Sequence, residues 1–298
     1  MKRRAAAPPE HATQAIGGAT PDDEALQPAK GGSEASDSAV RNAPVIMLSY
    51  QHSGAGRVQD LLAAGTGLAC TSGTGIIPLC AAAAETWRRI EGHHGRAMSR
   101  LAVAAVRGLV SAQITVILAG VGKTRWCELA TADPSAAQSF LEVFPHAVFV
   151  CVHRRCPDVI RAGIQASPWG LHGQGLGPYL LSYPGNSLAT LAAYWANSTE
   201  ELLAFENANP QITRRVRYED VTAGPGEALT GLRVWLGLDN PRGSTFPEQV
   251  DSPEPDAEAA QSAGPEVPAA MIPMPLRQRI NHLHAGLVYP LLTELSKD

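Results

Sequence analysis

A short segment near residue 50 carries several groups that can bind an anion. It comprises, in order, His52, Ser53, Gly54, Ala55, Gly56 and Arg57. Small residues let backbone N–H groups approach an anion closely, and the amino end of a following helix adds a favourable dipole. Ser53 adds a hydroxyl donor, and His52 or Arg57 adds positive charge. Many turns between a strand and a helix carry glycine for the turn alone, so the segment by itself favours a plain turn, and a phosphate-binding loop stays open as the alternative.

A second glycine-containing segment, Gly-Val-Gly-Lys-Thr at residues 120–124, ends like a nucleotide-binding P-loop. A full P-loop carries another glycine five residues before Gly122, and Ile117 occupies that position. The residues that follow, Trp126 and Cys127, favour a strand or a turn over a helix. We therefore expect a plain turn with an exposed Lys123, and a P-loop-like kinase stays open as an alternative.

Two arginines, Arg154 and Arg155, follow the most apolar segment of the chain. Guanidinium groups at the end of a buried strand suit planar contacts with phosphate or sulfate oxygens. The alternative is an arginine that pairs with Asp158 or Glu219 and closes the edge of the fold. The residue types alone leave both interpretations open.

Two further groups of polar residues carry weaker signals. Glu219 and Asp220 follow Tyr218, and such acidic pairs are commonly helix caps or surface charges. His93 and His94 lie between two glycines, and adjacent histidines point in different directions on a helix. They make a poor metal site without a third ligand, so we expect a solvated loop and no metal requirement.

These segments need elements that position them, and hydrophobic periodicity predicts those elements. Helical spacing begins directly after the first loop, with Val58, Leu61 and Leu62 on one face. Strands are predicted at residues 44–50, 114–120, 147–153 and 212–218, and helices at 85–112 (broken near Gly92 and Gly95), 135–144, 158–166, 188–208, 227–238 and 275–295. Strands that alternate with helices indicate an α/β fold with a mainly parallel sheet. Ligands bind beyond the carboxyl ends of such strands, so the loops after residues 50, 120, 153 and 218 are the expected sites.

Composition narrows the class of protein. The chain has 298 residues and a formal net charge of −4 without a basic stretch, which argues against nucleic-acid binding. No uninterrupted apolar run approaches the length of a membrane span, and no apolar segment follows the basic start, so we expect a cytoplasmic protein without a membrane partner. Five cysteines without paired spacing indicate reduced thiols.

The bounds of the domain, and an insertion within it, are also predicted from composition. Residues 1–43 and 241–268 are rich in Ala, Pro, Gly, Ser and acidic residues, and we expect both to be disordered. This leaves one domain over residues 44–298, with the second stretch as an insertion.

In their order and spacing, these motifs together resemble the sulfotransferases that use 3′-phosphoadenosine-5′-phosphosulfate. The resemblance rests on the Ser-Gly loop at 53–54, Arg-x-x-x-Asp-Val at 154–159, Arg-Tyr-Glu-Asp-Val at 217–221 and Trp-Leu-Gly-Leu at 235–238. Segments 70–80, 124–160 and 192–205 are similar to the actinobacterial branch, with more distant similarity to tyrosylprotein sulfotransferases. It covers residues 44–238 and, more loosely, the final helix.

The resemblance implies a fold, a cosubstrate and roles for individual residues. The fold is a P-loop-like parallel sheet flanked by helices in three layers. The loop at 52–57 would hold the 5′-phosphosulfate, Arg154 would contact the 3′-phosphate, and Tyr218 falls where tyrosylprotein enzymes place a donor-binding tyrosine. Sulfuryl transfer of this kind needs a base but no metal, and we take Glu128 as the candidate base, ahead of Ser72, His93 and His94. A protonated His52 would stabilise the leaving phosphate.

The chain departs from the family pattern at several of these positions. His52 replaces the usual lysine or arginine, Ala55 and Gly56 replace two threonines, and Ala162 replaces the serine of the second 3′-phosphate contact. Leu129 stands where a lysine is common, and Gly73 where the tyrosylprotein branch has its glutamate base. Donor binding would therefore depend mainly on backbone groups and arginines.

The resulting expectation is a sulfotransferase that acts on a hydroxyl of a small molecule, plausibly a natural product. The alternative is a protein of the same fold that binds the donor without turnover. The glycine-rich stretch at residues 167–183 is interpreted either as a lid over the acceptor or as an ordinary surface loop.

Overall fold

The computed structural model describes residues 43–92, 98–131, 134–167, 170–171, 175–238 and 267–292. The two stretches predicted to be disordered lie outside the described residues, apart from Ala43, which is buried, and the pair Val267 and Pro268. His93 and His94 also lie outside the described residues.

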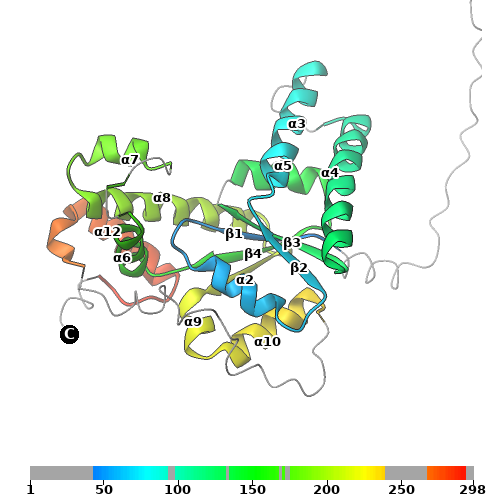
Figure 1. Cartoon of the computed structure of the whole chain (residues 1–298). Helices are drawn as coiled ribbons and strands as arrows, with labels where there is room; N and C mark the ends of the chain where they lie inside the picture. The colour runs from blue at the N-terminus through cyan, green and yellow to red at the C-terminus, as the bar shows by residue number, and fades with distance from the viewer. Residues whose placement is uncertain are drawn as a thin grey trace, which may run out of the picture.

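A five-stranded parallel sheet forms the centre of the molecule (Figure 1). Its strand order is β2-β3-β1-β4-β5, so the first strand lies in the middle. The strands are β1 (Val45–Ser49), β2 (Leu68–Ser72), β3 (Arg125–Thr131), β4 (Val148–His153) and β5 (Thr213–Arg217). In β1, Val45 pairs with Cys127 on one side and with Val148 on the other. Strands that follow β1 in the chain therefore lie on both sides of it. Open α/β sheets bind ligands beyond the carboxyl end of a strand at which the strand order reverses in this way.

Helices cover both faces of this sheet, which gives the three layers expected from the sequence (Figure 1). One face packs against α2 (Ala55–Ala63), α9 (Tyr218–Ala223) and α10 (Pro225–Leu236). The other packs against α3 (Ile76–Ile90), α4 (Arg100–Val121), α5 (Pro134–Val143), α6 (Cys156–Ala166), α8 (Ser187–Ala208) and α12 (Met274–Gly286). The shorter α7 (Gly177–Ser182) lies against α8, and a 3₁₀ turn, η2 (Ala269–Met271), precedes α12.

The predicted strand at 114–120 is wrong, because these residues form the last turns of α4. β-branched residues suggested a strand, but Ile114, Ile117 and Leu118 continue the helical stripe that Val106 and Val110 begin. The strand of this region is β3, which begins eleven residues after the start of the predicted strand. This strand was not predicted because the charged residues Arg125 and Glu128 interrupt its apolar pattern, although both are buried.

The Gly-Val-Gly-Lys-Thr segment connects the end of α4 to the start of β3. It therefore lies at the amino ends of the parallel strands, whereas the expected site lies at their carboxyl ends. Gly122 ends α4 in the left-handed conformation, and Lys123 Nζ donates to Thr66 O at 2.8 Å. The lysine therefore holds a neighbouring loop at the amino ends of the strands. This position contradicts the kinase alternative.

Candidate functional site

The loop between β1 and α2 turns through two left-handed residues. His52 has φ 64° and Gly54 has φ 77°. A Cβ atom at Gly54 would lie 2.2 Å from Tyr218 Cε2, so glycine is required both for the turn and for the close approach of the tyrosine ring. Gly54 begins α2 without a side-chain cap, so the first N–H groups of the helix face the loop.

This loop encloses a pocket of about 320 Å³. Small residues (Gly, Ala and Ser) predominate in its lining, which comprises residues 49–56 together with Ser72, Gly73 and Leu129. Ser53, the predicted anion donor, is buried and belongs to this lining. The pocket brings the amino end of α2 next to the loop that follows β2. This arrangement can bind an anion through backbone N–H groups and the helix dipole.

Arg154 lies beneath this loop. Its side chain is only 2% exposed, and Nη1 donates to His52 O at 2.9 Å. The guanidinium carbon lies 4.4 Å from the centre of the Tyr218 ring, a cation–π contact. Arg154 is not part of the pocket lining, and its Nε is buried with no hydrogen-bond partner among the described residues. The arginine thus brings a positive charge to the underside of the loop.

The aromatic residues that hold this arginine were not predicted from the sequence. Tyr50 Oη donates to Arg154 O at 2.9 Å and accepts from Arg154 N at 2.8 Å. Trp195 Nε1 donates to the same carbonyl at 2.8 Å, and Tyr194 Oη accepts from Gln51 N at 3.0 Å. Burial raises the pKa of Tyr50 well above its usual range, so its hydroxyl stays protonated. The adjacent Tyr-Trp pair in α8 was the only signal, and aromatic residues in a long helix ordinarily indicate core packing.

His52 is half-buried in the same loop. Its ring packs toward α6, where a Cβ added at Gly163 would lie 3.2 Å from His52 Cδ2. Burial, and then the charge of Arg154, lower the pKa of His52 below its usual value. Its Nε2 is buried without a hydrogen-bond partner in the described part of the chain. In the free protein this favours a neutral imidazole over the cation expected from the sequence.

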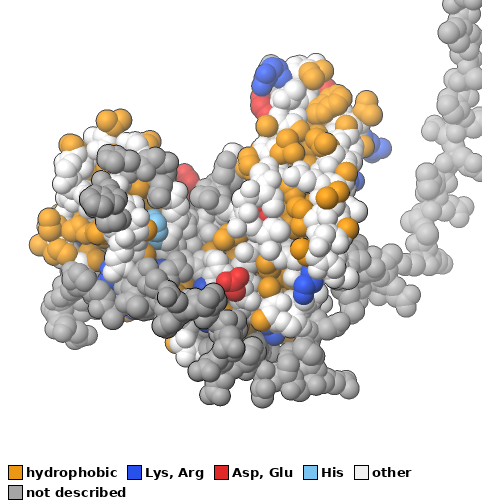
Figure 2. Space-filling view, in the orientation of Figure 1, with side chains coloured by type: hydrophobic (Ala, Val, Ile, Leu, Met, Phe, Trp, Pro, Cys, Tyr) orange, Lys and Arg blue, Asp and Glu red, His pale blue; other side chains and the backbone are white. Residues whose placement is uncertain are grey.

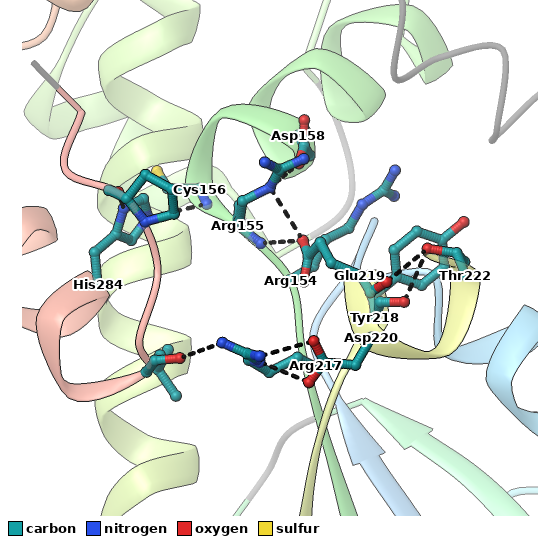
Figure 3. A network of polar contacts seen from close by, with 12 residues as sticks. Arg154, Arg155, Cys156, Asp158, Arg217, Tyr218, Glu219, Asp220, Thr222 and His284 are labelled. Carbon is teal, nitrogen blue, oxygen red and sulfur yellow. Dashed lines mark hydrogen bonds and ion pairs between the residues drawn. The ribbon is translucent and has the colours of Figure 1, made fainter. Parts of the chain in front are cut away.

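Of the two adjacent arginines, Arg155 forms the ion pairs that the sequence left open as an alternative to anion binding. Arg155 Nε pairs with Asp158 at 2.7 Å and with Glu219 at 3.5 Å, which is the edge-closing arrangement. Its backbone N–H also donates to Glu219 Oε1 at 2.9 Å. Figure 3 shows how this network joins the start of α6 to the start of α9. Asp220 pairs with Arg217 at 2.7 Å, a local contact of the kind predicted for surface charges.

Glu128 lies beside the pocket but does not line it. The carboxylate is 3% exposed and accepts from Thr71 Oγ1 at 2.5 Å, Thr74 N at 3.0 Å and Thr74 Oγ1 at 2.8 Å. These bonds fasten the turn between β2 and α3, which carries the pocket residues Ser72 and Gly73. Both carboxylate oxygens are therefore occupied by the turn.

The remaining predicted residues lie at varying distances from the pocket. Tyr218 begins α9 and, as described, contacts the loop with its ring. Ala55 and Gly56 form the first turn of α2 in the pocket lining, whereas the half-buried Arg57 of the same turn is not part of the lining. Ala162 is buried on α6 and offers no polar atom. Ser72 is exposed at the rim.

The stretch predicted as a lid is only partly described. Within it, α7 rests on α8, and Tyr179 packs edge-on against Tyr194 with ring centres 5.7 Å apart. The lid function stays a prediction. The five cysteines are all free, as expected, and all except the half-buried Cys70 are buried.

Fold and site together define an α/β protein whose parallel sheet presents a small pocket at the carboxyl end of its central strand. A family model described as "Sulfotransferase family" matches residues 44–242. The chain belongs to this family and is a transferase enzyme, which confirms the resemblance found in the sequence.

Among the similar solved structures, the first below supports the fold. The sulfotransferase domain from the curacin biosynthetic pathway is 14% identical, with a TM-score of 0.54, over 84% of this chain and 98% of that one. A sulfotransferase from Alicyclobacillus acidocaldarius is 10% identical, with a TM-score of 0.49, over 86% and 99% of the two chains. The sulfotransferase domain of the Synechococcus PCC 7002 olefin synthase is 18% identical, with a TM-score of 0.47, over 84% and 96%. No curated protein sequence matches the chain.

Proposed function

We propose that the enzyme transfers a sulfuryl group from 3′-phosphoadenosine-5′-phosphosulfate to a hydroxyl group of a small molecule, in the cytoplasm. The observation that supports this donor is the pocket at the amino end of α2, with the buried Arg154 beneath it. A natural product is the acceptor class that the resemblance implies.

The residues present fit such a donor. Two buried nitrogen atoms, His52 Nε2 and Arg154 Nε, have no partner in the described protein, and both belong to or support the loop. Buried polar groups without partners are uncommon in folded proteins, and ligands often supply what is missing. Ser53 and the uncapped first turn of α2 add further donors. Together they suit an anion that has several oxygen atoms.

The chemistry assigns simple tasks to these groups. In an in-line transfer, the acceptor oxygen bonds to sulfur as the bond from sulfur to the 5′-phosphate oxygen breaks. Negative charge then grows on that phosphate, where the loop N–H groups and Ser53 can stabilise it. Arg154 adds positive charge from below and keeps the loop in place through His52 O. Positioning and electrostatic stabilisation supply most of the acceleration in the analogous phosphoryl transfer.

The acceptor proton must pass to a base, and we assign Glu128 a supporting role in place of the base role first considered. Its oxygens are occupied by Thr71 and Thr74, and it lies outside the pocket lining. Through these bonds it positions the turn at Ser72 and Gly73. Ser72, at the rim, is the described candidate nearest to an acceptor.

Substitution of Gly54 tests the site directly. In Gly54→Ala the methyl group would collide with Tyr218, so the loop must move. We expect binding of 3′-phosphoadenosine-5′-phosphate, measured by titration calorimetry, to weaken at least about tenfold, a loss of about 1.4 kcal/mol. Gly231→Ala is the matched control, because a Cβ there meets no atom within 4 Å and Gly231 lies on α10, outside the pocket lining. Equal affinity in the two variants would contradict the proposed site.

A further inference from the structure

Helix α4 is apolar on nearly all sides, yet only one side is packed. Ala102, Val106 and Val110 are buried against the rest of the domain, where α4 contacts α3 and α5. By length and composition α4 could cross a membrane, which sequence analysis missed because Arg107 divides its apolar run. Figure 2 shows hydrophobic side chains over the part of the surface where α3 and α4 project in Figure 1. A helix of this composition is normally covered all round, so the outer face calls for a partner.

The outer face has the spacing of a helix–helix contact. Five exposed residues recur at intervals of four, three, four and three, and we call them the α4 seam. The α4 seam comprises Ala105, Leu109, Ala112, Val116 and Ala119. This is the spacing at which two helices interlock side chains. No charged residue occurs from residue 108 to residue 122, so nothing along most of the helix opposes close approach.

The order of small and large residues selects one orientation. If a second α4 runs antiparallel about a two-fold axis near residues 110 and 111, Leu109 faces Ala112 and Val116 faces Ala105. Each of these layers, which involve four of the five seam residues, then joins one large side chain to one small one, and this arrangement fills space evenly. A parallel pair would instead place Leu109 against Leu109 and alanine against alanine. The α4 seam therefore favours an antiparallel copy of itself, which is also the self-complementary geometry of a two-fold dimer.

Charge at the ends of α4 agrees with this orientation. Arg100 is exposed in the first turn, where a positive charge opposes the helix dipole. In the antiparallel pair it lies beside the carboxyl end of the second copy's α4, near Val121 and Gly122, where the dipole attracts a cation. Arg107 is the other charged residue of α4, and its Nε donates to Val143 O at 2.8 Å within the same chain.

We propose that a second copy of this chain docks antiparallel on the α4 seam and forms a weak two-fold dimer. A helix of 22 residues is about 33 Å long and about 10 Å wide, so a single helix pair covers a few hundred Å² on each copy. That is below the roughly 800 Å² per partner of a stable complex, so assembly should depend on concentration. A lipid surface fits less well, because helices that lie on membranes have a strongly polar second face and α4 has none. Residues 1–42 also fit poorly, since they contain few large apolar residues.

Sedimentation of the full chain over a range of concentrations tests the proposal. We expect wild type to shift from monomer to dimer at micromolar concentrations, and Leu109→Glu to remain monomeric at least tenfold higher. Val234→Glu is the matched control, because Val234 is 69% exposed on α10, far from the seam in the sequence. It should dimerise like wild type. A wild type that stays monomeric throughout, or that floats with vesicles of phosphatidylcholine and phosphatidylglycerol as a monomer, would overturn the proposal.

Engineered disulfides test the orientation. In the antiparallel pair, an Ala105→Cys/Val116→Cys double variant should form a covalent dimer under mild oxidation. Neither single variant should do so, because the two copies of residue 105 would lie about 16 Å apart along the helix axis, beyond disulfide reach. A parallel pair would instead cross-link each single variant. Covalent dimers of Ala105→Cys alone would therefore contradict the antiparallel arrangement.

Discussion

Arg154 is the residue on which the proposed donor site most depends. It is held between a backbone carbonyl of the loop and the face of Tyr218, and a tyrosine and a tryptophan fix its own backbone. A buried guanidinium that pairs with no carboxylate among the described residues is electrostatically suited to an anionic ligand. Its neighbour Arg155 supplies the structural pairing, so the two arginines are not interchangeable.

Removal of the Arg154 side chain should weaken the binding of the donor nucleotide. Loss of a charged hydrogen-bond donor costs about 1.5–3 kcal/mol, so Arg154→Ala should bind 3′-phosphoadenosine-5′-phosphate about 10–100-fold more weakly. Arg161→Ala is the matched control, because it also removes one arginine charge. Arg161 lies on α6 and forms an ion pair with Asp158 at 2.7 Å. Titration calorimetry measures both. Wild-type affinity in Arg154→Ala would show that this motif has been assigned incorrectly.

His52 predicts a pH dependence of donor binding. Burial and Arg154 lower its pKa in the free protein, whereas a bound phosphosulfate would raise it. Between these two pKa values the complex holds a proton that the free protein lacks, so binding takes up a proton and tightens as the pH falls. Calorimetry in buffers of different ionisation enthalpy measures this uptake. His52→Asn should abolish it; uptake that persists in His52→Asn would assign the proton to another group.

At the scale of elements, the turn between β2 and α3 completes one wall of the pocket. Glu128 holds it with hydrogen bonds from Thr71 and Thr74, and Trp126 Nε1 donates to Thr71 Oγ1 at 2.8 Å. Two residues of one strand thus fix the connection that follows its neighbour. This arrangement distinguishes a positioning carboxylate from a base.

Paired substitutions separate these two roles. If Glu128 positions the turn, Glu128→Gln and Thr74→Val should each lose about 1–3 kcal/mol of unfolding free energy, measured in urea, and turnover should fall to a similar extent in both. If Glu128 were the base, Glu128→Gln alone would lose about 10²–10⁴-fold in turnover. That second pattern would overturn the positioning role.

Most elements of this fold could be predicted, and the exceptions have physical reasons. Continuous apolar strands such as β4 and amphipathic helices such as α5 can be recognised from the sequence alone. The segment at 114–120 did not, because its β-branched residues fit a strand, whereas tertiary packing extends α4 through them. β3 was missed because its buried polar side chains are satisfied only by residues distant in sequence, such as Ala43, whose carbonyl accepts from Arg125 Nε at 2.7 Å.

At the scale of the whole molecule, the parallel sheet brings loops that are distant in sequence together at the carboxyl ends of its strands. The loops after β1, β2, β4 and β5 meet there, so His52, Gly73, Arg154 and Tyr218 lie at or beside one pocket. The sequence predicted three of these loops from strand order and residue type. It did not predict the support from Tyr50 and Trp195, because that contact joins residues 145 apart in sequence. Loop chemistry is readable from local sequence, but the packing that fixes it is not.

The most direct test of the proposed function compares two nucleotides on the full-length protein. Titration calorimetry measures the affinity for 3′-phosphoadenosine-5′-phosphate and for ATP, each with and without Mg²⁺. We predict that 3′-phosphoadenosine-5′-phosphate binds without Mg²⁺, and that ATP binds at least about tenfold more weakly, a difference of about 1.4 kcal/mol or more. Tighter binding of ATP, or no measurable binding of 3′-phosphoadenosine-5′-phosphate, would contradict the proposed function.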